Sequence, residues 1–591
     1  MRVYVSITGA GKARVIQFRE DTRIPGTTKK KTKVIKTLGN YERMLAEDPD
    51  IIQKLKQEAA AITKAKKESR TPITLQLQVA DITSPEDTTP SFSFGHALIK
   101  RLWTQMSLDE FFSTSCGKRN TEAVARALYF LIAHRCASPA SIRASVMNQD
   151  SYAGVEPVGQ DVFYDVLDVL ANQKEAMIEH LCSFFERKTT RNGPEAFYDV
   201  TTYHFESTKW GELRMFGFSK NHKNNEVQVV MGLLMDNNGI PITYELFPGN
   251  TMDQSTLKSS VENLKELYKL DKITIVADKG LNSGNNLTYL CGQGHDFVIS
   301  YTLKRSPEAF KELVWNDKDW QSTVDKESGE VVSRHKVVRQ QLESKVPLTP
   351  EELSRVKKRG RPPKYRTEDI PVNIHLVWSA KRAAKDRADR ERVLERLEKR
   401  LDKPYQLKAA IQRGCNQYLQ MQLDTENWHI DEEKIRYAAQ FDGHYAVITN
   451  NLKYTTEQVT TIYGGLWKIE ESFRVLKTDL RARPVYVWND NHIKGHFALC
   501  FLSLCLVRYA QHLLSTEKNL DYSAARLCKA FREPVALAQG VYPSTVVTPT
   551  KVPQEYLDLA EVLGLPQLKT NMTLTQFRAT TKLDLSVNLK D

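Results

Sequence analysis

The segment EAFYDVTTYHF, residues 195–205, decides the fold class of this 591-residue sequence, because it opens a series of strand-like segments. It is rich in the aromatic and β-branched residues that are typical of β-strands. Two more strand candidates follow, and a helix that begins with capping-box spacing, over 251–270, separates them from the last two. These four segments are NEVQVVMGLLMD (225–236), PITYELF (241–247), KITIVADKG (272–280) and HDFVISYT (295–302). Strands, a helix and further strands in one stretch predict a mixed α/β layer.

The sequence changes its pattern on either side of this α/β stretch. Residues 1–40 alternate like strands, and helical periodicity dominates 95–188 and the residues after about 490. A charged segment interrupts the strand pattern before GHYAVITN resumes it. We therefore expect six regions: a basic hairpin with a helix and linker (1–90), a helical region (91–190), the first part of the core (191–304), an insertion (305–440), the second part of the core (441–482) and a C-terminal helical region (483–591).

The composition is that of a globular, water-soluble chain with several domains. Hydrophobic residues make up 41% and charged residues 26%, and the net charge of +12 permits a polyanionic partner without requiring one. The N-terminus has no apolar signal segment, and the longest apolar run, 497–507, suits a core helix, so no membrane partner is expected. Eight cysteines occur singly, which argues against a zinc cluster and fits a reducing cytoplasm.

Two aspartates stand at unusual places in the predicted strands. Asp199 lies among aromatic and β-branched residues, where a carboxylate is costly unless it is paired or bound to a metal, and Thr201 faces the same side. Asp278 ends the apolar strand ITIVAD, and ligands of open α/β sheets collect beyond the carboxyl ends of strands. The alternatives are an edge-strand residue facing water for Asp199 and a turn-capping aspartate for Asp278.

A third acidic candidate lies in YGGLWKIEESFRVLK, residues 463–477. Treated as one helix over 463–481, this stretch has an apolar seam. The seam consists of Leu466, Ile469, Phe473, Leu476 and Leu480. On this helix Glu471 points away from the seam into solvent, whereas Glu470 lies on its shoulder together with Tyr463 and Lys477. The alternative for Glu470 is an ion pair with Arg474 at i,i+4 spacing.

Three carboxylates, two at sheet positions and one on a helix shoulder, would suit hard divalent cations such as Mg²⁺. Two such ions about 3.5–4 Å apart can activate a water or a 3′-hydroxyl and stabilise the leaving oxygen of a phosphodiester. The sequence alone does not show that the three acids lie close together, so this chemistry is a hypothesis at this point.

The motifs YDVTT, VADKG and Y-x₆-E-x₆-K together resemble those of the DDE transposases of bacterial insertion sequences, in the subgroup with a Tyr-Arg-Glu-Lys signature. PGNTMD, DGHYAVITN and RPVYVW are similar to segments around those motifs, and the resemblance extends from the basic N-terminal region to about residue 510. It implies a ribonuclease-H-like catalytic core, a mixed sheet with flanking helices, interrupted by an insertion. It also implies that Asp199, Asp278 and Glu470 are the catalytic residues and bind two Mg²⁺ ions, with Mn²⁺ as a substitute.

The resemblance further implies that Tyr463 and Lys477 contact DNA phosphates near the cut. The arginine of the signature does not match, because Leu466 occupies its position within the seam. Arg474 and Arg481 are the candidates to replace it.

Two basic segments are candidates for further DNA contact. KKRGRPPK, 357–364, resembles an AT-hook, in which Arg359 and Arg361 would enter an A·T minor groove. The run that begins with Lys29, Lys30 and Lys31 suits phosphate contact. The alternatives are a solvated basic loop for the first segment and a lysine-protected hairpin edge for the second. The helical region 95–188 is a candidate for recognition of DNA ends.

We therefore expect a DNA transposase that binds terminal inverted repeats, cleaves DNA with Mg²⁺ and transfers the freed strand to target DNA. The resemblance implies at least a homodimer in the DNA complex and a bacterial cytoplasmic location, on the nucleoid when DNA is bound. Two alternatives remain open: a nuclease on the same core, and an inactive transposase-derived protein that regulates by binding DNA.

Overall fold

The computed structural model divides the chain into two compact units, Met1–Asp81 and Ile82–Asp591. Each unit has a hydrophobic core of its own and is described separately. The structure describes residues 2–23, 30–68, 75, 81–84, 88–115, 121–188, 195–217, 226–268, 272–304, 306–355, 364–401, 418–421 and 428–589.

The N-terminal unit is a three-stranded antiparallel sheet with two helices. In chain order these elements are β1 (Arg2–Thr8), β2 (Val15–Arg23), β3 (Lys30–Asn40), α1 (Tyr41–Glu47) and α2 (Ile51–Glu68). Alternate residues of β1 and β2 point inward and meet the apolar face of α2. The buried core consists of Val3, Ile16, Phe18, Leu55 and Ala59. The alternating strands and the following helix are thus present as the sequence predicts.

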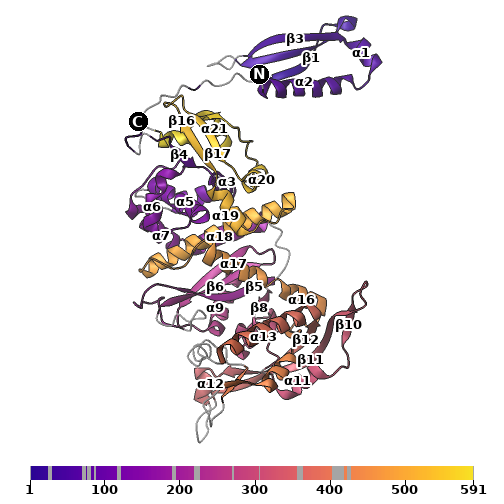
Figure 1. Cartoon of the computed structure of the whole chain (residues 1–591), viewed down its shortest axis with the longest axis vertical. Helices are drawn as coiled ribbons and strands as arrows, with labels where there is room; N and C mark the ends of the chain where they lie inside the picture. The colour runs from indigo at the N-terminus through magenta and orange to yellow at the C-terminus, as the bar shows by residue number, and fades with distance from the viewer. Residues whose placement is uncertain are drawn as a thin grey trace. The chain divides into compact units, whose positions relative to one another are not determined.

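A nine-stranded mixed sheet is the main element of the second unit (Figure 1), with the order β10-β11-β12-β15-β9-β8-β5-β6-β7. The strands are β5 (Glu195–His204), β6 (Gln228–Asp236), β7 (Pro241–Pro248), β8 (Thr274–Ala277), β9 (Asp296–Tyr301), β10 (Gln321–Val324), β11 (Val331–Pro347), β12 (Tyr365–Ser379) and β15 (His444–Thr449). The five segments predicted as core strands are β5 to β9, so the mixed α/β fold class is confirmed.

Strands β5 to β9 combine antiparallel and parallel pairing. β5, β6 and β7 form an antiparallel meander, whereas β8 is parallel to β5 and β9 is parallel to β8. Tyr198 of β5 contacts α9 (Asp253–Tyr268) through Ser260, while Tyr203 packs on Phe497 of α18 (Asp490–Lys518). Because residues of opposite parity point to opposite faces of a strand, helices cover both faces of the sheet here.

The segment 305–440 adds three strands to the same sheet. β12 pairs with β15 of the core, and β11 and β10 continue the sheet outward from β12. The other elements of this segment are α11 (Glu308–Trp315), α12 (Pro350–Arg355), α13 (Ala380–Leu401), α15 (Glu432–Ala439) and a small sheet of β13 (Leu419–Met421) with β14 (Trp428–Ile430). The inserted segment is therefore joined to the core by main-chain hydrogen bonds.

The region 91–190 is helical, as its periodicity predicts. Its helices are α3 (Ala97–Gln105), α4 (Leu108–Ser115), α5 (Thr121–Ala137), α6 (Ile142–Met147), α7 (Gln160–Asn172) and α8 (Lys174–Lys188). Helices α5 and α7 pack on α18, where a Cβ on Gly495 would overlap the Leu167 carbonyl oxygen. Among the described helices, α18 alone has the length and hydropathy of a membrane span, but 78% of that apolar stretch is buried in the protein. The prediction of a core helix at 497–507 is thus confirmed.

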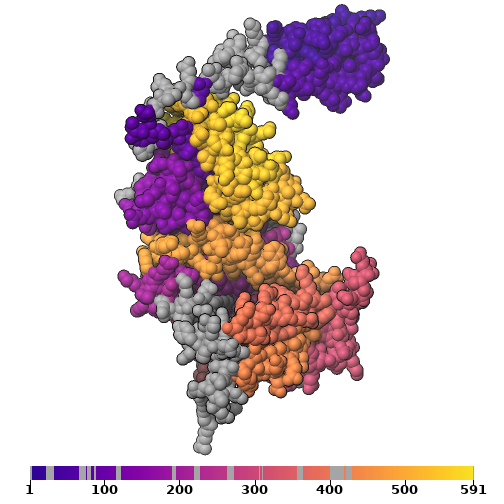
Figure 2. All heavy atoms as spheres, in the orientation of Figure 1, coloured from indigo at the N-terminus to yellow at the C-terminus, as the bar shows by residue number. Residues whose placement is uncertain are grey.

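The C-terminal region contains strands as well as helices, which corrects the prediction of a helical region over 483–591. β16 (Val535–Gln539), β17 (Val546–Lys551) and β18 (Met572–Thr573) form a sheet with β4 (Ser91–Ser93), so the two ends of the unit lie side by side (Figure 2). Helices α19 (Ala524–Arg532), α20 (Gln554–Val562) and α21 (Leu574–Thr581) complete this region. β16 pairs with β4, which lies more than 400 residues earlier, so this sheet depends on a contact between distant segments.

Candidate active site

Of the two aspartates predicted as metal ligands, Asp199 lies on β5 and Asp278 directly follows the neighbouring parallel strand β8. β5 and β8 pair with Phe197 opposite Val276, and continuing this register by two residues places Asp199 opposite Asp278. Neighbouring strands are about 4.8 Å apart, and facing residues of a parallel pair point to the same side. β5 lies between β8 and β6 within the sheet, which excludes an edge-strand position for Asp199.

Each aspartate uses one carboxylate oxygen to accept a local backbone hydrogen bond. Oδ1 of Asp199 accepts from the Val200 amide and Oδ1 of Asp278 from the Gly280 amide, both at 2.7 Å. The turn-capping role considered for Asp278 is therefore present, and it fixes the orientation of the carboxylate. Within the described part of the chain Oδ2 of Asp278 has no hydrogen-bond partner, so one oxygen is available to a ligand.

Helix α17 (Trp467–Thr478) runs along the face of β5 that carries Asp199. Just before the helix, Gly465 packs so closely on the Phe197 ring that a Cβ would lie 2.5 Å from Cζ. Near the other end of the helix, Nζ of Lys477 donates a hydrogen bond to Oγ1 of Thr201. The three strand residues have the same parity and share one face. The helix and the strand therefore run in the same direction, side by side.

Glu470 stands level with Asp199 along this helix and strand. It lies about 7.5 Å beyond Gly465 at the rise of an α-helix. Asp199 lies about 6.6 Å beyond Phe197 at the rise of a strand. Because Gly465 and Phe197 are in contact, the two acids lie at a similar height along the helix and the strand. The Glu470 side chain is exposed and makes no hydrogen bond or ion pair with another described residue.

The helix predicted over 463–481 is two helices, because it breaks at a glycine pair. α16 (Thr456–Gly464) ends where Gly465 packs on the sheet, and α17 follows. Tyr463 therefore lies on the last turn of α16 and does not share a helix face with Glu470. The apolar seam is nonetheless buried at all five predicted positions: Leu466, Ile469, Phe473, Leu476 and Leu480.

The adjacent Glu471 is half-buried, which corrects the prediction that it points into solvent. Its carboxylate accepts a hydrogen bond from Nη1 of Arg508 on α18 at 3.0 Å and lies 3.5 Å from Nη2 of Arg474. α18 covers this side of α17, so the buried face is wider than the apolar seam. Arg474 pairs with Glu471 and with Asp479 rather than with Glu470, so the ion pair considered for Glu470 is not formed.

Tyr463 lies within electrostatic reach of acids from both the sheet and the helix. Burial is the largest cause of the raised pKa of Tyr463. A hydrogen bond with Ser300 and the charge of Arg382 lower this pKa, whereas the carboxylates of Asp278 and Glu470 raise it. The charges of Asp278 and Glu470 both act on the Tyr463 hydroxyl. The end of β8 and helix α17 therefore both lie near Tyr463.

A cavity of about 790 Å³ opens beside Asp278, and its lining includes Arg382, a residue that the sequence did not indicate. It is lined by Lys279, Ser300 and, at the start of α13, Arg382. The guanidinium of Arg382 lies 4.7 Å from the centre of the Tyr445 ring. No motif near the three acids points to this residue, because it belongs to a long charged helix far away in the sequence.

The comparisons with known proteins bear on the whole of this region. A family model described as the transposase DDE domain matches residues 194–506, more than half of the chain. The chain belongs to the transposase DDE domain family. Among solved structures, a piggyBac transposase synaptic complex with hairpin DNA aligns at a TM-score of 0.33 and 9% identity, over 84% of this chain and 83% of that chain, a similarity too low to support an inference. No curated protein matches the sequence.

DDE transposases cleave DNA and transfer strands, and they generally use divalent metal ions. In this transposase domain, no group of three His, Cys, Asp or Glu side chains among the described residues is close enough to hold an ion as it stands. The donor set nevertheless suits Mg²⁺, because all three candidate ligands are carboxylates. Asp199 lies on β5 and Asp278 directly follows the neighbouring strand β8, whereas Glu470 is exposed on α17.

The remaining predicted DNA contacts of the transposase fall mostly outside the described residues. Lys29, Arg359 and Arg361 are not described, and Lys30 and Lys31 are described only as backbone of β3. Of the two candidates for the missing signature arginine, Arg474 is engaged by acids of its own helix region, and Arg481 lines a different cavity. Leu466 is buried, as its place in the seam predicts.

Proposed function

We propose that this chain is a DNA transposase that binds the terminal inverted repeats of a mobile element, cleaves a phosphodiester and joins the freed 3′-hydroxyl to target DNA. The observation that carries the proposal is the alignment of Asp199 with Asp278 across two parallel strands, with Glu470 level with them on α17. An antiparallel meander followed by two parallel strands supports the ribonuclease-H-like core that the resemblance implies.

The three acids would hold two Mg²⁺ ions, with Mn²⁺ able to replace them. Hard divalent cations prefer oxygen ligands, and a pair of them activates a water or hydroxyl and neutralises charge that develops on the phosphate. The protein contributes the rigid placement of the ligands: two strands fix Asp199 and Asp278, and the contact of Gly465 with Phe197 sets the position of α17.

Cationic and phenolic side chains around the acids would hold the DNA strand. Lys477 reaches the acidic face of β5 from α17, and Lys279 and Arg382 approach from the cavity beside Asp278. Such side chains bind phosphates by charge and fix the register of the strand. A tyrosine hydroxyl is protonated at neutral pH, and burial raises the pKa of Tyr463 further, so this hydroxyl can donate a hydrogen bond to a phosphate oxygen.

The assembly follows from the reaction proposed. Two transposon ends must be held together while each is cut, so we propose at least a homodimer in the complex with DNA, in the bacterial cytoplasm. The resemblance supports this assembly.

The test is a set of isosteric substitutions. Asp199→Asn, Asp278→Asn and Glu470→Gln should each abolish Mg²⁺-dependent cleavage of a plasmid that carries the element's ends, while end binding in a mobility-shift assay is largely kept. Each should also weaken Mn²⁺ binding measured by titration calorimetry. Glu457→Gln is the matched control, because Glu457 is an exposed acid on α16 nearby. Retained cleavage in any of the three variants would overturn the assignment.

The same assay separates the alternative functions. Joining of an oligonucleotide with a free 3′-hydroxyl to target DNA marks a transposase, whereas cleavage without joining marks a nuclease. Binding without any Mg²⁺-dependent nicking marks a regulator that has lost its chemistry.

A further inference from the structure

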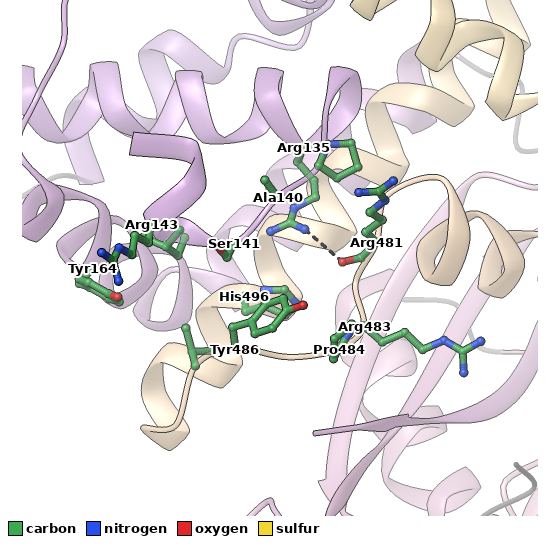
Figure 3. Close-up of a pocket in the computed structure, with 13 residues that line it drawn as sticks. Arg135, Ala140, Ser141, Arg143, Tyr164, Arg481, Arg483, Pro484, Tyr486 and His496 are labelled. Atoms are coloured by element: carbon green, nitrogen blue, oxygen red, sulfur yellow. Dashed lines mark hydrogen bonds between the residues drawn. The ribbon is translucent and has the colours of Figure 1, made fainter. Parts of the chain in front are cut away.

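A second cavity, of about 530 Å³, lies between helices α5, α6 and α7 and the chain that follows α17 (Figure 3). Its charged lining is entirely basic, because it contains four arginines and no Asp or Glu. The arginines are Arg135, Arg143, Arg481 and Arg483. They come from helices α5 and α6 and from the segment between α17 and α18, so the fold gathers them from distant parts of the sequence.

Arg135 carries a buried positive charge that no carboxylate of the described residues neutralises. It is 5% exposed, and its Nη1 donates to the carbonyl oxygens of Leu480 at 3.3 Å and Arg481 at 3.2 Å. A buried charge is costly unless it is paired, and carbonyl oxygens supply only partial charge. His496 in the cavity wall stays neutral, because burial first and Arg135 second lower its pKa to about 3.

The other three arginines also lack an ion-pair partner within the described part of the chain. Like charges around one cavity repel one another, so the arrangement favours an anion between them. Arg481 has a φ of 44°, in the left-handed region that residues other than glycine rarely adopt. Such strain is concentrated at functional sites, and here it accompanies the carbonyl group that Arg135 binds.

Aromatic side chains extend the basic cavity onto the surface. Tyr486, which lines the cavity, is 58% exposed, and Trp488, two residues later on the same segment, is 49% exposed. The guanidinium of Arg214 lies 5.4 Å from the centre of the Trp488 ring. A basic groove flanked by exposed aromatic rings is the usual arrangement for holding nucleic-acid backbone and stacking on bases.

We propose that this cavity binds a backbone phosphate of the DNA strand away from the bond to be cut, with Tyr486 and Trp488 packing on the sugars or bases beside it. A small anion would use the arginines but not the exposed rings, which favours a polynucleotide. Arg481 lies three residues beyond the end of α17, the helix that carries Glu470. The inference rests on the proposed function only in taking DNA as the partner.

The test measures DNA binding as a function of salt, in an Asp199→Asn background so that cleavage plays no part. Arg143→Ala and Arg483→Ala should each lower the slope of log K against log salt by about 0.9, which is about an eightfold loss of affinity at 0.1 M salt. Arg187→Ala is the control, because it removes an exposed arginine from the end of α8. Tyr486→Ala should weaken binding and Tyr486→Phe should restore it.

The outcomes distinguish this inference from the proposed function. Unchanged slopes in both arginine variants, at unchanged melting temperature, would overturn the DNA site even if the wild-type chain cleaves DNA. If the arginine variants lower the salt slope but the chain with Asp199 intact does not cleave DNA, the result would support the DNA site and count against the transposase proposal. Displacement of inorganic phosphate alone, with no effect of the variants on DNA binding, would also overturn it.

Discussion

Converting the two adjacent glutamates of α17 to glutamine, one at a time, should separate folding from chemistry. Glu471→Gln removes the charge that faces Arg508 of α18, whereas Glu470→Gln changes an exposed side chain level with Asp199. The two substitutions have the same size and chemistry, so each serves as the control for the other. We expect Glu471→Gln to lower the stability of the protein without abolishing cleavage. We expect Glu470→Gln to abolish cleavage without changing the stability.

The cost of Glu471→Gln follows from its ion pair. Removing one partner of a buried pair costs about 3–5 kcal/mol when the other charge is left without compensation. Glu471 is 23% exposed, and Arg508 keeps hydrogen bonds to Ser472 and Gln511, so we expect about 2–3 kcal/mol. For a cooperative unit of roughly 500 residues at about 2.1 cal/mol/K per residue, this lowers Tm by about 2–3 °C.

The cost of Glu470→Gln falls on the reaction instead. An exposed side chain without partners contributes within about 0.5 kcal/mol to stability, so Tm should change by less than about 1 °C. A metal ligand contributes several kcal/mol to the transition state, and each 1.36 kcal/mol is tenfold in rate, so cleavage should fall by at least about a thousandfold.

Differential scanning fluorimetry measures the first effect, and Mg²⁺-dependent nicking of a supercoiled plasmid that carries the element's ends measures the second. The reasoning is wrong if Glu470→Gln cleaves at the wild-type rate, or if Glu471→Gln loses cleavage with an unchanged Tm. The first result would remove Glu470 from the proposed site, and the second would transfer the chemical role to the glutamate that contacts Arg508.

Three other perturbations have measurable outcomes. Arg382→Ala should weaken DNA binding about eightfold at 0.1 M salt if one phosphate contact is lost, and an unchanged salt slope would show that Arg382 does not reach DNA. Replacing Arg359 and Arg361 together by Ala should weaken binding to A·T-rich duplexes more than to G·C-rich duplexes in fluorescence anisotropy, and equal loss would reduce the segment to a generic basic loop. Burial lowers the pKa of His134 to about 4 and of His496 to about 3, so the unfolded chain binds more protons below the usual histidine pKa. Stability should therefore fall between about pH 6.5 and 4, by up to about 1.4 kcal/mol per pH unit for each histidine, and a flat Tm over that range would contradict this.

The sequence predicts the core strands well because their signals are local. Each of β5 to β9 is a run of apolar, aromatic or β-branched residues, and a buried strand needs little more to be recognised. Helix periodicity predicts Glu470 on the shoulder of the seam and Glu471 in solvent, whereas the structure has Glu470 exposed and Glu471 half-buried. The choice of Glu470 as a ligand therefore rests on the motif spacing of the resemblance. Whether Glu470 binds a metal is a prediction that the substitutions above will test.

What the sequence could not show depends on contacts between distant segments. The half-buried place of Glu471 comes from α18, more than thirty residues later, whose Arg508 looks like any helical arginine. Arg382 and the four-arginine cavity likewise arise from segments that only the folded chain brings together. The C-terminal strands were missed because pairing with β4, at the other end of the unit, stabilises them rather than their own pattern.

The continuity of the large sheet has a mechanical consequence. β12 begins at Tyr365, directly after the AT-hook-like segment, and is bonded laterally to β15, β9 and β8 in turn, the last of which leads into Asp278. In the proposed DNA complex, force applied at the start of β12 would act along the strand and would be resisted by many interstrand hydrogen bonds at once. In this complex, the strands of the inserted segment would therefore transmit force to the strand that leads into Asp278.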